Sequence, residues 1–319
     1  MTLRRWGGYA LLAGMAWCLA HYFVRPGMDQ YRQSVASAEV ANASNGPGSG
    51  LQLTWYGTAT VAVSDGTTTL LLDPFFSRSG GGLMQLLNMP AKPEAAVVSA
   101  WLGEKAVPGG IDAMLVSHSH YDHLLDVGVV GELTGARLYG GESTVNVGLG
   151  HGLPAAQVQL AEPMREISIG DFKATFIPWS HGGTGGHPKG VTDKPLPRDA
   201  RYLAYKLGDV YAIHLQHPLG SLLHIGSAGK PAVNNVPPAE TVLLSLAMRE
   251  PLNELIATDG SVKTVVPIHW DDFFQPLSKP LRPLPFGVSL GQFYHDMAAQ
   301  FPAVNVLSLQ PGNQVTLQQ

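Results

Sequence analysis

The sequence is almost free of cysteine. Cys18 is the only one in 319 residues. A single thiol cannot form a disulfide within the chain, and it cannot supply the several thiolates of a structural zinc site. Any metal site in this protein must therefore use histidine and carboxylate side chains.

Charge is also scarce. Charged residues make up 14% of the chain, the formal net charge is −4, and there is no long run of lysine or arginine. Nucleic acid binding needs a basic surface, so nucleic acid is excluded as the main partner. In contrast, 45% of the residues are hydrophobic. That is enough for a sizeable core, and the length suits one large domain or two ordinary ones.

The N-terminus has its own pattern. A short basic stretch precedes residues 6–24, which carry no charge apart from a possible one on His21. This length is near the roughly 20 residues that span a bilayer, and the basic side is expected to stay in the cytoplasm. We predict that residues 1–26 form a membrane anchor and that the rest is exported to the periplasm or outside the cell. The alternative is a cleaved signal peptide, with small residues at 18–20 and a secreted product.

A polar segment of low complexity, "SVASAEVANASNGPGSG", follows the apolar run. It has no apolar residues with which to join a core, so residues 27–50 are predicted to be a flexible linker. The folded domain is expected over residues 51–319.

The stretch "MLVSHSHYDHLL" at residues 114–125 concentrates histidine. Its first part reads as a short buried strand. Alternate side chains of an extended segment share one side, so His118, His120 and Asp122 are expected to point together, with His123 starting the next element. Imidazole and carboxylate groups converging at a strand end are typical zinc ligands. The alternative is a solvated histidine patch.

Two later histidines repeat this placement. His181 follows the predicted strand "FKATFIPW", and His269 follows "VKTVVPI". Ser227 lies in a turn after a third strand, "SLLHI". Taken singly, either histidine could be a buried core residue, but together they indicate a site on one edge of a sheet. The remaining histidines are interpreted as structural, with His187 a weak exception because it lies in the loop beside His181.

Other segments carry weaker signals. Residues 51–76 read as an antiparallel meander of about three strands. Residues 79–93 read as a loop with apolar side chains, either an ordinary packed loop or a flap over a substrate. Residues 201–207 read as a further strand.

The motif "HSHYDH" resembles the H-x-H-x-D-H motif of the metallo-β-lactamase superfamily, and the resemblance covers residues 51–317. The segments "LTWYGTATVAV", "LLLDPFFS", "VVPIHWDDF" and "LQPGNQVTL" resemble its lactonase-like and N-acyl-phosphatidylethanolamine phospholipase D-like branch. The resemblance implies an α/β fold, a four-layer αββα sandwich with metals at one edge of two sheets.

The resemblance also implies one or two zinc ions, with iron or manganese as alternatives. The implied ligands are His118, His120 and His181 for one ion, and Asp122, His123 and His269 for the other. Asp73 matches a carboxylate near the metal histidines. There are two departures. Ser227 stands where the family usually has a bridging aspartate, and Thr58 stands where the branch often has histidine.

These ligands predict a metal-dependent hydrolase. Zinc lowers the pKa of a bound water towards about 7, and Asp122 is predicted to orient this nucleophile or carry its proton. The expected substrate is a small molecule or lipid-like compound with an ester, lactone, amide or phosphodiester bond. The alternatives are a metal-binding or sensing module with impaired catalysis, supported by Ser227 and Thr58, and an iron-dependent redox enzyme.

Overall fold

The computed structural model describes most of the chain from residue 50 onward. The described ranges are 50–78, 81–104, 110–183, 187–247, 252–257, 259–277, 280–284 and 289–317. The predicted anchor and all but the last residue of the predicted linker lie outside them. Within these ranges, no helix is long and apolar enough to cross a membrane.

The first sheet has seven strands in the order β14-β1-β2-β3-β4-β5-β6. Its strands are β1 (Leu51–Trp55), β2 (Val61–Ser64), β3 (Thr69–Leu72), β4 (Ala113–Leu115), β5 (Arg137–Gly140), β6 (Val158–Leu160) and β14 (Gln314–Leu317). Strands β14 to β3 pair antiparallel, which confirms the predicted meander, and β3 to β6 pair parallel.

The second sheet also has seven strands, in the order β13-β12-β11-β10-β9-β8-β7. Its strands are β7 (Glu166–Ile169), β8 (Phe172–Pro178), β9 (Tyr211–His217), β10 (Gly220–Ile225), β11 (Thr241–Ser245), β12 (Thr264–Ile268) and β13 (Asn305–Val306). The two sheets are therefore equal in strand number, and each combines antiparallel and parallel pairs.

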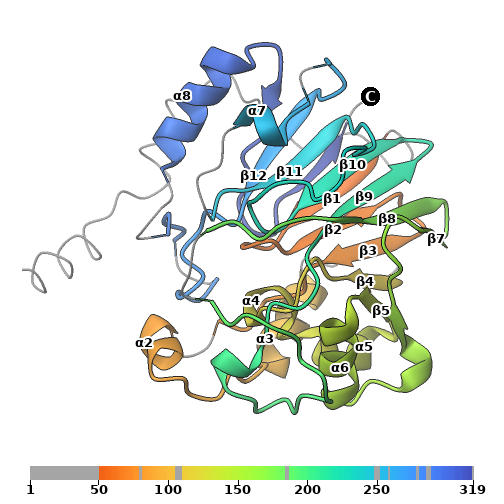
Figure 1. Ribbon diagram of the computed structural model, residues 1–319, viewed down its shortest axis with the longest axis vertical. Helices are drawn as coiled ribbons and strands as arrows, with labels where there is room; N and C mark the ends of the chain where they lie inside the picture. Colours follow the sequence, from red (N-terminus) through yellow and green to blue (C-terminus); the bar gives the residue numbers. More distant parts are fainter. Residues whose placement is uncertain are drawn as a thin grey trace, which may run out of the picture.

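Helices cover the outer face of each sheet (Figure 1). Beside the first sheet lie α3 (Ala95–Glu104), α4 (Tyr121–Leu124), α5 (Val127–Thr134) and α6 (Glu142–Gly150). Beside the second lie α7 (Leu252–Leu255) and α8 (Leu290–Gln300). A short helix, α2 (Gly81–Leu86), and two 3-10 turns, Ala155–Gln157 and Tyr202–Ala204, complete the elements.

Alternation along the strands explains the layers. In β3, Leu70 and Leu72 belong to the core shared with the second sheet, whereas Leu71 packs with the helices on the other face. In β4, Met114 likewise packs on the helical side. Because both faces of these strands are covered, they are apolar throughout. The predicted four-layer αββα sandwich is confirmed.

Two local predictions were wrong. Residues 81–86 form α2 and not a loop, since Leu, Met and Gln favour a helix and Gly81 alone has a positive φ, of 61°. Residues 202–204 form a 3-10 turn and not a strand. Tyr202 and Tyr205 are both buried, and their spacing of three matches one 3-10 turn better than strand alternation.

Candidate metal centre

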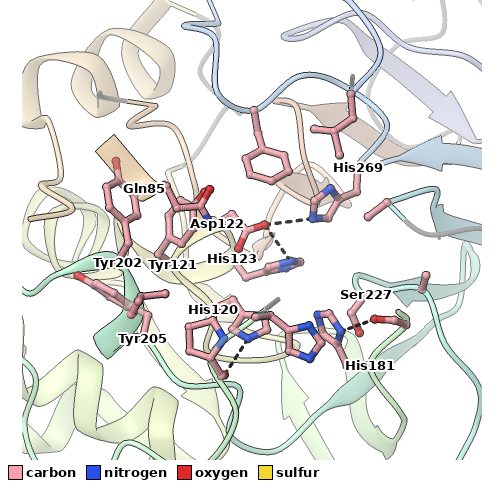
Figure 2. Close-up of a pocket in the computed structure, with 18 residues that line it drawn as sticks. Gln85, His120, Tyr121, Asp122, His123, His181, Tyr202, Tyr205, Ser227 and His269 are labelled. Atoms are coloured by element: carbon pink, nitrogen blue, oxygen red, sulfur yellow. Dashed lines mark hydrogen bonds and ion pairs between the residues drawn. The ribbon is translucent and has the colours of Figure 1, made fainter. Parts of the chain in front are cut away.

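The predicted ligands lie at the ends of strands from both sheets. His118 and His120 follow β4, and α4 begins directly after them and carries Asp122 and His123. His181 and His269 follow β8 and β12. The structure brings all six side chains together at one edge of the sandwich, and Figure 2 labels every one except His118.

The first triad consists of His118, His120 and His181. One nitrogen of each ring lies within 4.8 Å of the others, and Nε2 of His118 is 3.1 Å from Nδ1 of His120. The opposite nitrogens face backbone carbonyls: His120 Nε2 lies 3.2 Å from Pro188 O, and His181 Nδ1 lies 2.6 Å from Gly182 O. Because a carbonyl only accepts, these nitrogens carry the protons. The lone pairs of His120 Nδ1 and His181 Nε2 then remain free for a metal.

Burial keeps the first triad neutral. It lowers the pKa of His118 well below its usual value, with the neighbouring histidines acting in the same direction. Burial also lowers the pKa of His120 to about 4 and that of His181 to about 3. At neutral pH all three rings are therefore neutral, each with one nitrogen lone pair available, as metal ligation requires.

The second triad consists of Asp122, His123 and His269. Oδ2 of Asp122 is 3.3 Å from His269 Nε2 and 3.9 Å from His123 Nε2 (Figure 2). Burial raises the pKa of Asp122, but the imidazoles of His123 and His269 lower it by more. The net result is a pKa well below the usual range. This triad therefore carries a carboxylate charge that the first triad lacks.

Asp73 contacts His123 at the ring nitrogen that faces away from Asp122. It is fully buried, its Oδ2 lies 2.8 Å from His123 Nδ1, and its Oδ1 accepts a hydrogen bond from Ser117 N at 2.7 Å. This contact places the ring proton on Nδ1 and leaves Nε2 facing Asp122. Only glycine fits at position 226, where a Cβ would lie 2.5 Å from Asp73 Oδ2.

Five of the six ligands, all except His118, line a cavity of about 260 Å³. Tyr121, Tyr202, Tyr205 and Phe273 form an aromatic part of its wall, and in Figure 2 the tyrosines lie on the side away from His181. No lysine or arginine lines the described part of this cavity. One half therefore offers metal ligands and the other an apolar surface.

The donor set fits divalent metal ions. Five imidazoles and one carboxylate converge in two groups of three, and a proton or hydrogen-bond partner occupies the far nitrogen of most rings. Three protein ligands with room for a further one are typical of catalytic zinc, and iron accepts the same donors.

Comparison with known proteins agrees with this geometry. The family model described as "Beta-lactamase superfamily domain" matches residues 68–204, which include β3, β4 and every predicted ligand except His269. This match identifies residues 68–204 as a β-lactamase superfamily domain, in agreement with the resemblance of the histidine motif. A metal-dependent hydrolase of Myxococcus xanthus is 25% identical over 274 residues, covering 83% of this chain and 85% of the relative. One of Anaeromyxobacter sp. (strain K) is 35% identical over 149 residues, covering 44% of this chain and 46% of the relative.

Solved structures share the superfamily's fold. A metallo hydrolase from Ignicoccus hospitalis has a TM-score of 0.54 at 15% identity and covers 84% of this chain and 99% of its own. A diiron β-hydroxylase from Streptomyces venezuelae has a TM-score of 0.52 at 16% identity and covers 85% of this chain and 54% of its own. The relatives confirm that the protein is an enzyme, a metal-dependent hydrolase of this fold. The narrower branch stays a prediction.

Ser227 departs from the superfamily pattern and lies inside the cavity. It is 4% exposed, and within the described ranges its Oγ has no hydrogen-bond partner. Figure 2 shows it beside His181, on the loop after β10. It thus lies close to the ligands, as a bridging position requires, but it brings no charge.

Two histidines interpreted as structural also lie near the ligands. The ring of His187 is 4.4 Å from that of His181 and lines the cavity. His224 Nε2 lies 3.0 Å from Ala59 O and 3.5 Å from Asp73 Oδ2, so it packs beneath Asp73. For His187, its position close to His181 in the sequence was a weak indication that it lies near the site. No feature of the sequence indicated this for His224.

A third cluster, Asp65, Asp171 and His217, also has metal-ligand spacing. Here His217 Nδ1 accepts a hydrogen bond from Leu219 N at 3.0 Å, and Nε2 lies 3.1 Å from Asp65 Oδ2. Since Nδ1 is an acceptor, Nε2 carries the proton and donates to Asp65. Neither nitrogen is left for a metal, so this cluster is a structural contact.

Proposed function

We propose that the protein is a zinc-dependent hydrolase that cleaves an ester, lactone, amide or phosphodiester bond with water. The observation that supports this proposal is the convergence of six ligand atoms in two groups of three, with five of the six residues lining one cavity. Bound zinc would supply a water nucleophile with a lowered pKa and polarise the group under attack.

Asp122 has a second role in this proposal. The imidazoles beside it keep its carboxylate ionised, so one oxygen can ligate while the carboxylate accepts a hydrogen bond from the attacking water. Orienting the water in this way fixes its direction of attack. No side-chain nucleophile is needed.

The cavity supports an amphiphilic or lipid-like substrate. Its aromatic wall continues towards α2, because Tyr202 N donates to Met89 O and Leu203 N donates to Asn88 Oδ1 at 2.9 Å. The α2 region exposes several large apolar side chains: Leu83, Met84, Leu86, Leu87 and Met89. We call these five residues the apolar ridge. An acyl or aryl group attached to the scissile bond fits such a surface.

The test is metal analysis of the purified protein, followed by turnover on a panel of esters, lactones, amides and phosphodiesters. We expect bound zinc and hydrolysis that a chelator abolishes and added zinc restores. Hydrolysis that persists without metal would contradict the proposal.

A second candidate is a metal-binding or sensing module with impaired catalysis, which the neutral Ser227 favours. It predicts bound metal with no turnover on any member of that panel. Iron in the purified protein, with oxidation in place of hydrolysis, would instead point to a redox enzyme.

We further propose that residues 1–26 anchor the domain on the outer side of the cytoplasmic membrane. The uncharged run at residues 6–24, preceded by basic residues, supports this. Full-length protein should fractionate with membranes, and protease added outside the inner membrane should digest the domain. Recovery of a soluble protein that begins at His21 would show a cleaved signal.

A further inference from the structure

A buried ion pair lies behind the second triad. Nη1 of Arg78 is 2.7 Å from Oδ2 of Asp271, and the two side chains are 1% and 0% exposed. Neither residue lines the cavity that holds the ligands. Burying two charges is costly unless both find further hydrogen bonds, so their other contacts show what the pair holds in place.

Both members of the pair form hydrogen bonds with Thr58. Asp271 Oδ1 accepts a hydrogen bond from Thr58 N at 2.8 Å, and Arg78 Nη2 donates to Thr58 Oγ1 at 3.0 Å. Thr58 has a φ of 50°, in the left-handed region that β-branched residues rarely enter. Such a conformation persists only where the surroundings impose it. The ion pair supplies that constraint.

Thr58 in turn holds the backbone of His269. The carbonyl oxygen of Thr58 accepts a hydrogen bond from His269 N at 2.7 Å. His269 also has a left-handed backbone, with a φ of 54°. The direction in which its side chain leaves β12 therefore depends on the contact with Thr58.

The ring of His269 contacts Asp122 through Nε2 and packs edge-on against Phe273, but no hydrogen bond among the described residues fixes its far nitrogen. Its Nδ1 is buried without a hydrogen-bond partner, whereas His120, His181 and His123 each have the far nitrogen beside a carbonyl or carboxylate. The other ligands are thus oriented through their rings. His269 lacks that contact at its far nitrogen, so its orientation depends more on its backbone.

We propose that Arg78 and Asp271 are positioning residues for the second triad. Through Thr58 they hold His269 in the left-handed conformation that aims its Nε2 at Asp122. The inference rests on the six-ligand site proposed above. It extends that site to an ion pair that touches no ligand side chain and whose partners are far apart in the sequence.

Gly57 provides an independent way to disturb the pair. A Cβ at this position would lie 2.2 Å from Arg78 Nη2 and 3.1 Å from Asp271 Oδ2. Gly57→Ala must therefore displace the guanidinium without altering either charge, and because Gly57 has a φ of 89° it also strains the backbone beside Thr58. It should weaken the same metal site as a change to the pair itself.

The main test uses full-length protein with the double substitution Arg78→Met and Asp271→Leu. Removing both charges avoids an unpaired buried ion, so the variant should fold with a similar melting temperature. Zinc affinity at the two sites is measured by chelator competition, and Co²⁺ absorption spectra report each site's coordination. We expect the second affinity to fall by about 10- to 100-fold, the usual effect of losing a supporting contact, with the first unchanged.

Asp65→Asn is the matched control. It removes the charge from the partly buried contact with His217, which touches neither triad, so it should lower stability while leaving both zinc affinities unchanged.

Wild-type protein is titrated first. If it binds no second ion, the proposed two-site centre is wrong, and the inference falls with it. If the wild type binds two ions and the folded double variant binds both equally well, the centre stands and the positioning role alone is overturned. Equal weakening of both sites would also overturn it, since that is the result of a purely structural role.

Discussion

The two triads are held by different forces. In the first, His120 and His181 are fixed by the carbonyls of Pro188 and Gly182, and burial lowers the pKa of every ring. In the second, carboxylates surround the ligands, since Asp122 is itself a member and Asp73 holds His123. The comparison indicates that the first site depends on neutral rings and backbone, and the second on a balance of buried charges.

The raised pKa of His123 reflects the same difference. Burial lowers it, but the carboxylates of Asp73 and Asp122 more than offset this and hold the pKa above its usual value. Electrostatics therefore oppose protonation of the first triad, whereas in the second they keep Asp122 ionised and favour protonation of His123. Substitutions that alter charge should affect the second triad more than the first.

The largest effects are expected from the neutral triad. His118→Ala, His120→Ala or His181→Ala leaves one ion with two protein ligands, so metal and hydrolytic activity should be lost together. Metal content by elemental analysis and turnover by the purified variants check this. Undiminished metal content in all three variants would contradict the ligand assignment. His295→Ala, with a side chain 75% exposed, serves as the control and should change neither quantity.

The charged triad is probed by Asp122→Asn. This variant keeps a ligand oxygen but loses the charge that orients the water, so activity should fall by about 10²- to 10⁴-fold. Metal affinity should fall less, by about 10- to 100-fold. Parallel measurement of kcat and zinc affinity distinguishes the two roles. Equal losses would mean that Asp122 acts as a ligand only.

The sequence predicted the parts of this site that have a local pattern. An apolar run followed directly by histidine marks the ends of β4, β8 and β12, and the edge of a sheet brings such ends together. The meander at residues 51–72 was predictable because strands alternate with Gly57 and Asp65-Gly66 turn signals.

The parts that depend on contacts distant in sequence were not predictable. Thr58 and Asp271 are 213 positions apart and meet only because β1 and β12 belong to facing sheets. No periodicity marks Arg78, and His224 beneath Asp73 looks like any histidine in a strand. In the sequence, Thr58 is recognisable only as a departure from the usual histidine. The structure shows that its backbone links Asp271 to His269 through hydrogen bonds.

Ser227→Asp tests the charge balance directly. Two dications repel each other strongly at the separations of about 3.5–4 Å found in two-metal sites, and a shared carboxylate offsets part of this. Wild-type protein should therefore bind two zinc ions with unequal affinity. The substitution should tighten the weaker site by about tenfold or more. A zinc titration of both proteins at one pH measures this. If the weaker affinity does not change, Ser227 does not occupy a bridging position.

The smallest effect is expected outside both triads, at the apolar ridge. Leu86 is 81% exposed on α2, so Leu86→Ser should leave folding and metal content intact. If the ridge contacts the apolar part of the substrate, KM for a long-chain acyl ester should rise about threefold, since roughly 0.7 kcal/mol of apolar contact is lost. The value of kcat should not change, and neither should KM for a short polar ester.

Leu160→Ser is the matched control, because Leu160 is 61% exposed on β6 and does not line the cavity. A faster turnover of short polar esters than of acylated ones by wild-type protein would show that the ridge serves some purpose other than binding substrate. An equal KM change in both variants would instead trace the effect to general surface hydrophobicity.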